Sequence, residues 1–311
     1  MSAISRNSSP SAPASSPGSP PGELLPVPQL SPAELEAVAR LEAACFEADG
    51  GRLKLEWNVL RNRPAGTTSD FVWVVDGEVV GFIGIYQWMP ISLEVCGMVH
   101  PEWRGRGIGS GLYDAAAAEV AQRGPARALL IVDRALVEGR RLALVRGGEL
   151  DHSEHRMQQQ REPEERPGMP LVRVRPAVRS DASFVSECSA TAFEEDVRVV
   201  DEGDETAVGR LLNGTTLIEA ADSGRSVGVL RVEREGGAAS IYGFAVMPSE
   251  QGNGYGRAAL SAVTRDLHRS GVGVVSLEVL STNDSALHLY TTCGFDSIGT
   301  EDYYSMPIGS D

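Results

Sequence analysis

The stretch that decides the fold is V-M-P-S-E-Q-G-N-G-Y-G-R, residues 246–257. A run of β-branched and aromatic residues, 240–246, leads into it, and a helical pattern begins at Ala258. The stretch contains three glycines at alternate positions, Gly252, Gly254 and Gly256. Such glycines allow the backbone to curl tightly, and the following helix adds unsatisfied amide donors at the positive end of its dipole. Strand, loop and helix N-terminus together predict a cradle for a phosphate or a diphosphate.

The same pattern occurs a second time, as V-H-P-E-W-R-G-R-G-I-G at residues 99–109. Val, Pro, Arg or Gln, and three Gly residues recur at an offset of 147 positions, the difference between Gln251 and Arg104. The same offset relates Gly81 to Gly228. Repetition over this length indicates two copies of one domain rather than a solenoid.

Both loops resemble the acetyl-CoA diphosphate loop of the GNAT N-acetyltransferases, whose pattern is Arg or Gln, two residues, Gly, one residue, Gly. The resemblance covers nearly the whole chain after the first two dozen residues, as a tandem pair. It implies an α/β (α+β) fold of two tandem GNAT-like domains, each with a mixed, mostly antiparallel twisted sheet flanked by helices. It also implies acetyl-CoA as cosubstrate. The implied cofactor-binding residues are Val246, Gln251, Gly252, Asn253, Gly254, Tyr255, Gly256, Arg257 and Asn283 in the second copy, and Val99, Arg104, Gly105, Arg106, Gly107, Ile108 and Gly109 in the first.

Length and composition agree with two domains and limit the partners. A chain of 311 residues is too long for one ordinary domain and comfortable for two. The net charge of −15 argues against nucleic acid or an anionic membrane surface as the main partner. The four cysteines have no paired spacing, so neither a disulfide framework nor a metal site is predicted, and a cytoplasmic location is expected. No apolar run is long enough to cross a membrane.

Composition and the repeated motifs together predict four segments of the chain. These are a disordered Ser- and Pro-rich tail at 1–22, an N-terminal GNAT-like domain at 23–160, a linker at 161–169 and a C-terminal GNAT-like domain at 170–311. Two local signals support the first of these domains. Ser31 and Glu34 have the spacing of a capping box that opens a helix. Asp76-Gly77, between two apolar runs, is a strong hairpin signal.

Acetyl transfer to an amine also needs a base that takes a proton from the amine and a donor for the departing thiolate. Residues 277–295 resemble the second half of a GNAT domain, in which an Asn contacts the pantetheine arm and a Tyr lies near the thioester sulfur. Those roles fall on Asn283 and Tyr290. Glu278 precedes Tyr290 by twelve positions, a spacing similar to that of the ribosomal-protein alanine acetyltransferases, in which such a Glu is the base and such a Tyr the acid.

Each catalytic role has a structural alternative. Tyr290 could pack its ring on the sheet without any chemical role. Glu278 could be a solvated residue on an exposed strand, whereas a carboxylate in a closed cleft would have the raised pKa that suits a base. The sequence leaves both alternatives open.

The first copy departs from this pattern. Counting back from Gly294 and Gly148 gives an offset of 146 in this region. The first-copy residues then expected opposite Tyr290, Asn283, Glu278 and Phe295 are Leu144, Val137, Val132 and Glu149. The hypothesis is that the first domain is degenerate and binds CoA weakly or structurally, while the second domain catalyses.

The predicted function is an acetyl-CoA-dependent N-acetyltransferase acting on the primary amine of a small molecule or a peptide N-terminus. The tandem layout is also similar to that of the mycothiol synthases, small-molecule acetyltransferases with a degenerate partner domain. The alternative is a non-catalytic acyl-CoA-binding or sensing module with two cradles. A monomer and a homodimer are equally compatible with the sequence, because fold and composition fix neither substrate nor assembly.

Overall fold

The computed structural model describes residues 20–51, 53–64, 66–89, 92–163, 167–193 and 204–307. The chain divides into two compact units of mixed α/β structure. The first unit consists of Met1–Asp151 together with Asp302–Asp311, and the second consists of His152–Glu301. Within the described residues, no helix is long and apolar enough to cross a membrane.

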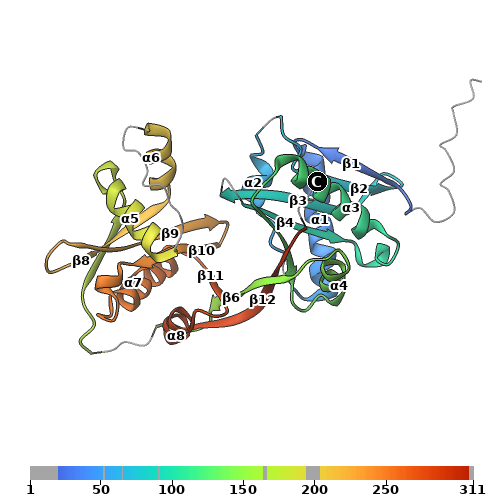
Figure 1. Cartoon of the computed structure of the whole chain (residues 1–311). Coiled ribbons are helices and arrows are strands. Elements are labelled where there is room, and N and C mark those ends of the chain that lie inside the picture. The colour runs from blue at the N-terminus through green and yellow to red at the C-terminus, as the bar shows by residue number, and fades with distance from the viewer. Residues whose placement is uncertain are drawn as a thin grey trace, which may run out of the picture. The chain divides into compact units, whose positions relative to one another are not determined.

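The first unit is built on a mixed sheet flanked by helices (Figure 1). Its complete elements are β1 (Glu23–Val27), α1 (Pro32–Asp49), α2 (Trp57–Arg61), β2 (Asp70–Val75), β3 (Glu78–Met89), β4 (Ser92–Val99), α3 (Ile108–Arg123), β5 (Arg127–Asp133) and α4 (Val137–Val145). The strands follow the order β1-β2-β3-β4-β5, and all neighbours are antiparallel except β4 and β5, which are parallel.

Local sequence signals place these elements where they were predicted. The Ser31 side chain accepts a hydrogen bond from the Glu34 backbone, the Glu34 side chain accepts one from the Ser31 backbone, and α1 begins at Pro32. Asp76 and Gly77 have φ angles of 51° and 85°, which give the tight turn between β2 and β3. The capping box and the hairpin are therefore confirmed.

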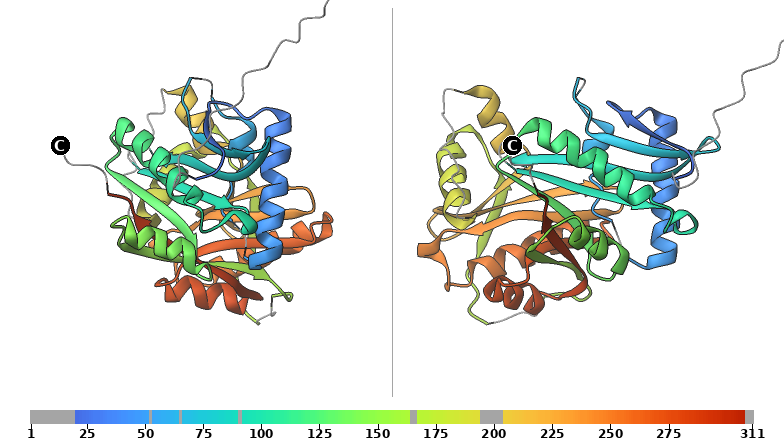
Figure 2. Two further views of the ribbon diagram at one scale, coloured as in Figure 1. Left: turned by 90° about the vertical axis from the view of Figure 1, so that its right-hand side faces the viewer. Right: turned by 45° about the vertical axis from the view of Figure 1, so that its right-hand side comes forward.

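The sheet of the first unit has a hydrophobic layer on each face, because successive strand residues point to opposite sides. One layer packs under α3 and α4 and includes Leu112, Val95 and Leu130. The other packs under α1 and α2 and includes Leu41 and Ile131. The turned views show α1 and α3 as separate layers around this sheet (Figure 2).

The second unit repeats this order of elements. Its complete elements are β7 (Val172–Pro176), α5 (Ala182–Phe193), α6 (Glu205–Leu212), β8 (Thr215–Ala220), β9 (Ser226–Glu235), β10 (Ala238–Val246), α7 (Tyr255–Arg269), β11 (Val274–Leu280) and α8 (Asp284–Thr292). The strand order is β7-β8-β9-β10-β11, again antiparallel except for the parallel pair β10 and β11. Hydrophobic clusters under α7 and α8 and under α5 and α6 cover the two faces.

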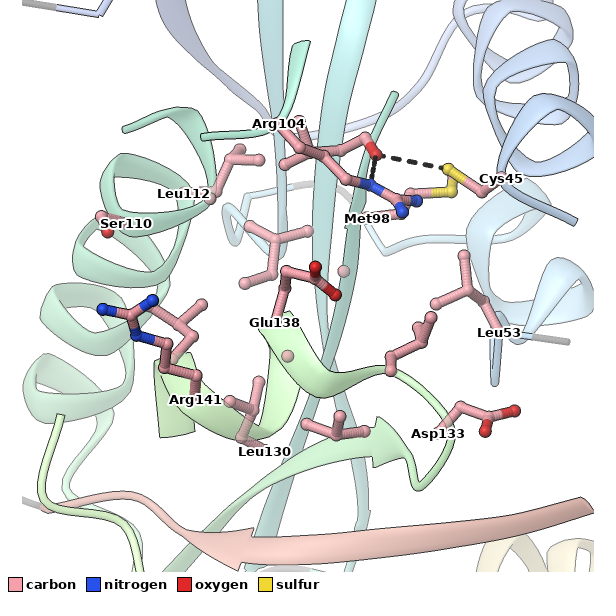
Figure 3. Close-up of a pocket in the computed structure, with 18 of the residues that line it drawn as sticks. Cys45, Leu53, Met98, Arg104, Ser110, Leu112, Leu130, Asp133, Glu138 and Arg141 are labelled. Atoms are coloured by element: carbon pink, nitrogen blue, oxygen red, sulfur yellow. Dashed lines mark hydrogen bonds between the residues drawn. The ribbon is translucent and has the colours of Figure 1, made fainter. Parts of the chain in front are cut away.

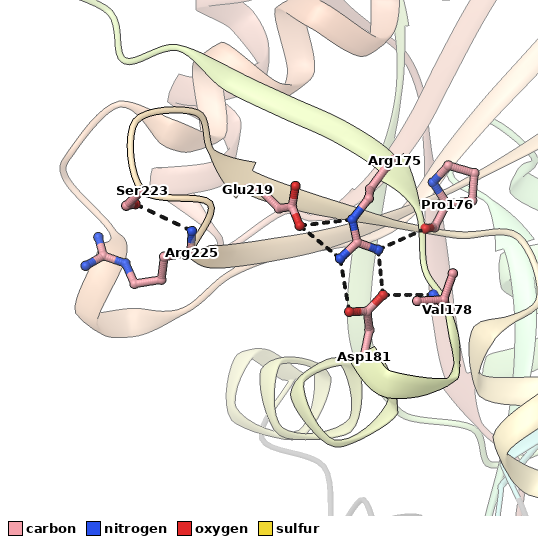
Figure 4. Close-up of polar contacts among 7 residues, drawn as sticks. All are labelled: Arg175, Pro176, Val178, Asp181, Glu219, Ser223 and Arg225. Carbon is pink, nitrogen blue, oxygen red and sulfur yellow. Dashed lines mark hydrogen bonds and ion pairs between the residues drawn. The ribbon is translucent and has the colours of Figure 1, made fainter.

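Arg175 fixes the start of α5 to the edge of this sheet. Its guanidinium donates to Glu219 on β8 at 2.9 Å and to both carboxylate oxygens of Asp181 at 2.6 and 3.1 Å (Figure 4). Asp181 in turn accepts from the backbone N–H of Val178 at 2.8 Å. The hydrogen bond from Arg175 is the main reason that the pKa of Asp181 lies below its usual range.

Two strands continue from one compact unit into the other. The strand β6 (Leu150–Gln159) begins in the first unit, but its residues 154–158 pair antiparallel with β11 in the second. The strand β12 (Phe295–Ser305) begins in the second unit and ends in the first, where Met306 N donates to Ala128 O at 2.8 Å. Each unit is therefore completed by a strand that is continuous with the other one.

The bounds of these units differ from the predicted domain bounds, since the units divide after Asp151 and the first includes the last ten residues. The predicted linker at 161–169 separates the two copies of the repeated sequence, whereas the compact units are defined by contacts. The linker therefore stays a prediction. The last three residues of the predicted tail are within the described part of the chain. The described residues Pro20, Pro21 and Gly22 pack on the first unit, because Trp73 Nε1 donates to Pro21 O at 2.7 Å. Residues 1–19 and part of the predicted linker, 164–166, lie outside the described residues.

A buried ion pair in the first unit gives a stability prediction. Arg63 donates to both oxygens of Asp70, at 2.9 and 2.6 Å, and to Ile85 O at 2.7 Å, and both charged residues are buried. We expect Arg63→Met to lower the free energy of unfolding by about 3–5 kcal/mol, because it leaves a carboxylate buried without its partner. Urea denaturation measures this change. Arg63→Met combined with Asp70→Leu should recover most of the loss, and equal losses in the single and double variants would contradict the explanation.

Candidate active site

The two glycine loops have nearly the same backbone geometry. Gly107 and Gly254 are the residues just before α3 and α7, with φ and ψ of 86° and −5° in the first and 84° and 0° in the second. Gly105 and Gly252 also have positive φ, at 73° and 76°. Each loop therefore presents the free N–H groups of a helix N-terminus, the arrangement that binds phosphate oxygens.

The residues that open the two loops fasten them to the preceding strand in the same way. Gln251 Nε2 donates to Val246 O at 3.0 Å, and Arg104 Nε donates to Val99 O at 3.0 Å. Arg104 also pairs with both carboxylate oxygens of Asp49 at 2.7 and 2.6 Å. The side chains of Gln251 and Arg104 thus hold the loop shape, and the backbone N–H groups remain the donors for a ligand.

Other predicted loop residues also stabilise the loops through their side chains. Asn253 Nδ2 donates to Glu250 O at 3.3 Å, and Arg257 Nη1 donates to Thr292 O at 3.1 Å, which joins α7 to the end of α8. Arg106 Nη2 donates to Glu102 O at 3.1 Å. The remaining predicted loop residues lie in the first turns of the helices: Ile108 and Gly109 in α3, and Tyr255 and Gly256 in α7.

Beside each loop, the two parallel strands separate. The β10–β11 register runs from Ala238↔Val274 to Ile241↔Leu277, and the ladder then ends. The β4–β5 register ends in the same way after four pairs, at Val95. A gap that opens beside a helix N-terminus lets an extended chain lie between the strands with its phosphate end on the loop.

The second unit has a feature at this gap that the first lacks. The pairing of β10 with β9 is irregular between Tyr242 and Ala245, and Gly243 in this bulge has a φ of 57°. The corresponding part of β4 pairs with β3 without irregularity, from Gly81↔Val99 to Tyr86↔Glu94. Bulges disrupt the ladder and re-aim groups next to active sites. This bulge was not predicted from the sequence, although Gly243 within an aromatic and β-branched run is a usable signal for one.

Tyr290 lies in α8 on the face of the sheet that packs under α7. Its ring centroid is 6.4 Å from that of Phe244, a residue of the bulge, and 6.3 Å from that of Phe295. The residue is buried, and burial raises the pKa of the phenol to about 12. Its hydroxyl makes no hydrogen bond within the described residues. A phenol that is held in a buried ring cluster and stays protonated at neutral pH can donate to a ligand.

Glu278 is exposed on the opposite face of the sheet. Leu277 and Val279 on either side of it belong to the same buried cluster as Tyr290, so the side chain of Glu278 points the other way. The side chain is therefore exposed on the strand and not enclosed in a cleft. Its partner in register on β6 is Arg156.

Asn283 is the residue before the first turn of α8. Its Oδ1 accepts from Ala286 N at 3.0 Å, which caps the helix. The structure thus brings Asn283 and Tyr290 to opposite ends of one short helix beside the strand gap.

The ends of the helices and strands correct the sequence offset of 146 that was expected between the C-terminal parts of the two copies. β5 and β11 start and end at positions 147 apart, as do α4 and α8, so the offset of 147 holds through both pairs and the predicted 146 is wrong. The first-unit residues opposite Tyr290, Asn283, Glu278 and Phe295 are therefore Ala143, Leu136, Ile131 and Gly148. The corrected alignment again places no hydroxyl, amide or carboxylate at the counterparts of the three polar residues.

The first unit contains a cavity of about 550 Å³ at its own loop and strand gap (Figure 3). Its lining includes the loop glycines 105, 107 and 109, Val99 and Arg104. Cys45 lies on the other side, with its Sγ 3.5 Å from Val99 O, and burial raises the pKa of this thiol. A cavity of this volume is within the range of small-ligand sites.

Comparison with known proteins places this arrangement in a family. The model of the acetyltransferase (GNAT) family matches residues 35–142 and 183–295, and the chain therefore belongs to this family of N-acetyltransferases. A mycothiol acetyltransferase of Nocardiopsis dassonvillei is 30% identical over 308 residues, which cover 88% of this chain and 93% of that protein. A [ribosomal protein bS18]-alanine N-acetyltransferase of Haemophilus ducreyi is 37% identical over 73 residues, which cover 23% of this chain and 50% of that protein.

Solved structures give the same result for the fold. A GCN5-related N-acetyltransferase from Sphaerobacter thermophilus has a TM-score of 0.74 and 24% sequence identity, with 91% of this chain and 95% of that chain covered. A tandem GNAT protein from the clavulanic acid biosynthesis pathway has a TM-score of 0.68 and 16% identity, with 93% and 99% covered. The predicted tandem GNAT fold is thereby confirmed.

The loops provide a direct test of cofactor binding. We expect Gly254→Val to weaken CoA binding at least about tenfold, because a β-branched residue is strained at this positive φ and its Cβ would lie 3.1 Å from Pro170 Cδ. Isothermal titration calorimetry of the full chain measures the affinity. Gly273→Ala is the matched control, since a Cβ there meets only Gly237 O at 3.8 Å. Unchanged affinity together with unchanged stoichiometry in Gly254→Val would count against the cradle of the second loop.

Proposed function

We propose that the chain is an acetyl-CoA-dependent N-acetyltransferase whose catalysis takes place in the second unit. The single observation that supports this choice of unit is the bulge at Gly243, where the strand gap, the glycine loop and Tyr290 come together. The first unit has the loop and the gap but neither a bulge nor a tyrosine at the corresponding positions.

The cosubstrate fits the second loop by the chemistry of its donors. Backbone N–H groups of residues 252–256 at the N-terminus of α7 would hold the diphosphate. The side-chain Nδ2 of Asn283, which makes no hydrogen bond within the described residues, would contact the pantetheine arm. Bound there, acetyl-CoA supplies an acetyl group activated as a thioester. Because the net charge of the chain is −15, these local donors must offset a repulsive overall field.

Tyr290 and Glu278 would act from opposite faces of the sheet. Tyr290 remains protonated at neutral pH and would donate to the departing thiolate sulfur. Glu278 lies at the end of the parallel ladder on the other face and would accept the proton of the attacking amine through water. The amine would arrive from the face that carries Glu278, and the thiolate would leave toward the face that carries Tyr290. A base and an acid on these two faces fit this geometry.

The first unit would bind CoA without transferring its acyl group. Its glycine loop has the same geometry as the second loop and it contains a cavity, but Ala143 and Ile131 replace the proposed acid and base. This cavity is also the observation that favours the second candidate function, a tandem acyl-CoA-binding or sensing module.

The proposed acceptor is a primary amine, of either a small molecule or a peptide N-terminus. The names of the two matched relatives, a mycothiol acetyltransferase and a ribosomal-protein alanine acetyltransferase, support these two classes. A cytoplasmic location, a monomeric or homodimeric state and the absence of a nucleic-acid partner stay predictions.

The test is a panel of small-molecule amines and short peptides with free N-termini, incubated with the full chain and acetyl-CoA while CoA release is monitored. Amine-dependent release of CoA is the result expected of a transferase. Tight CoA binding with no release for any amine, together with a ligand-dependent change in another property, would favour the sensing module.

A further inference from the structure

The inner ends of the two strand gaps differ in side-chain volume. In the second unit, the rings of Phe244, Tyr290 and Phe295 form a cluster with centroid distances of 6.4 and 6.3 Å. At the offset of 147, the first unit has Gly97, Ala143 and Gly148 at these positions. All three aromatic rings of the second unit are therefore replaced by the smallest residues in the first.

Backbone atoms of neighbouring strands fill only part of the volume that the three rings would occupy. A Cβ on Gly97 would lie 2.7 Å from Phe82 O, and one on Gly148 would lie 2.8 Å from Ser305 O, so the neighbouring strands have closed on both glycines. The cavity of about 550 Å³ remains, lined by Gly97 and by Leu142, the neighbour of Ala143. The open space of this gap therefore lies beside Gly97, the one of the three positions that lines the cavity.

The cavity has one end suited to phosphates. Its lining there includes the glycine loop and Ser110 in the first turn of α3. Arg141 of α4 also lines this end, and Figure 3 shows its side chain reaching toward α3. Arg141 is exposed and makes no ion pair or hydrogen bond within the described residues. A guanidinium that has no partner within the described residues, in a cavity that a helix N-terminus also lines, is suited to an anionic group.

The other end of the cavity lies across the sheet, where the lining is mostly apolar and also includes the ion pair of Asp49 with Arg104. β4 and β5 stop pairing after Val95 and Leu130, so the cavity continues between them toward α1. Its lining residues on the α1 side are Cys45, Leu53, Phe82, Met98 and Ile131. A ligand that fills the cavity must therefore have an anionic end and a long apolar end.

We infer that the first unit binds an acyl-CoA whose acyl group is a neutral alkyl chain longer than acetyl. This inference rests on the proposed function, which gives the first loop a CoA diphosphate. The diphosphate lies on the loop, the pantetheine arm passes between β4 and β5, and the alkyl chain occupies the apolar end. The thioester stays intact there, because the buried Cys45 thiol has a raised pKa and little of the reactive thiolate.

The charges of the lining exclude a second class of acyl group. Asp133 and Glu138 are carboxylates of the lining, and Asp133 is buried, with Oδ1 accepting from Ala135 N at 2.9 Å. A dicarboxylic acyl group would bring a further carboxylate next to these two, which is unfavourable at low dielectric. A neutral chain such as octanoyl avoids this repulsion.

The experiment measures chain-length preference at the first site of the full chain. In a chain carrying Gly254→Val, which disables the second loop, CoA, acetyl-CoA, octanoyl-CoA and succinyl-CoA are titrated by calorimetry. We expect octanoyl-CoA to bind at least about tenfold more tightly than acetyl-CoA, since each buried methylene contributes roughly fourfold. Succinyl-CoA should bind no more tightly than acetyl-CoA.

A second variant shows where the alkyl chain lies. Leu53→Trp fills the apolar end, and it should abolish the octanoyl preference while leaving acetyl-CoA affinity within about twofold, because the diphosphate site is untouched. Leu171→Trp, at a leucine that is 81% exposed, is the matched control and should keep the preference.

Three results would overturn the inference. Equal affinities for octanoyl-CoA and acetyl-CoA would mean that the apolar end takes no acyl chain, while the proposed CoA cradle of the first unit stands. An octanoyl preference that persists in Leu53→Trp would place the chain elsewhere. Loss of binding of every CoA compound in Gly254→Val would remove the first cradle itself, and with it that part of the proposed function.

Discussion

Tyr290→Phe should lower kcat by roughly 10² to 10³-fold, the loss typical of removing a positioned proton donor. The variant keeps the ring, so its packing between Phe244 and Phe295 and the fold should be unchanged. Because Tyr290 makes no hydrogen bond within the described residues, removal of its hydroxyl leaves no partner unsatisfied. Steady-state kinetics of CoA release measure kcat, and calorimetry should show CoA affinity within about twofold of the wild type.

The pH dependence gives an independent check of this role. Burial raises the pKa of Tyr290 to about 12, above its usual value of about 10, so the folded protein favours the protonated phenol. The resulting stabilisation is present below about pH 10 and is lost as the pH rises toward 12. We therefore expect no decrease in kcat from ionisation of Tyr290 between about pH 8 and 10.

A matched variant separates the hydroxyl from the ring. Tyr113→Phe changes a tyrosine of α3 in the first unit and should leave kcat within about twofold, because this residue has no proposed part in catalysis or in CoA binding. A Tyr290→Phe variant with wild-type kcat would leave only the packing explanation for Tyr290. A loss of CoA affinity equal to the loss of rate would assign the residue to binding instead.

A chain that ends at Glu301 should lose the folded first unit. It lacks the end of β12 and the residues after it, including Tyr303, Tyr304 and Met306, which are buried in the two hydrophobic layers of that unit. Burial of each such side chain contributes about 1.5–3 kcal/mol, so their joint loss is comparable with the whole stability of a typical domain, about 5–15 kcal/mol. The hydrogen bonds that Arg134 Nε and Nη2 donate to Asp302 Oδ1, at 3.0 and 2.6 Å, are lost as well.

Thermal denaturation and limited proteolysis measure this effect. We expect residues of the first unit to become protease-sensitive, although the deletion is at the opposite end of the sequence. A chain that ends at Pro307 is the matched control, since it keeps all of β12 and Met306, and it should remain protease-resistant. A resistant first unit in the chain that ends at Glu301 would show that β12 is dispensable.

The same strand arrangement predicts the behaviour of separated halves. A fragment of residues 170–311 lacks the part of β6 that pairs with β11, and a fragment of residues 1–169 lacks the end of β12. Each should be unstable alone, because an unpaired buried strand edge leaves backbone groups unsatisfied. The test of catalysis in the second unit is therefore better made with point variants of the full chain.

Local chemistry explains which parts of the fold could be predicted. The capping box at Ser31 and the Asp76-Gly77 turn depend on residues within four positions of one another, and both were found where expected. The glycine loops were predictable for the same reason, since positive φ at Gly107 and Gly254 is a property of glycine itself. The family also followed from these short motifs.

Parts that depend on distant residues were not predictable in this way. The expected offset of 146 was wrong because it was counted from glycine pairs, whereas the ends of β5, β11, α4 and α8 fix it at 147. The side of the sheet that Glu278 faces depends on the strand register, and the sequence left its exposure open.

The sequence alone determined that this chain has two copies of one cradle and belongs to one family, because a repeated loop and its glycines are local properties of the chain. Only the tertiary structure decided which strand completes which unit, where the β10 ladder is broken, and that Ala143 stands opposite Tyr290. These features depend on which residues meet after the chain has folded, and contacts between positions far apart have no local signal.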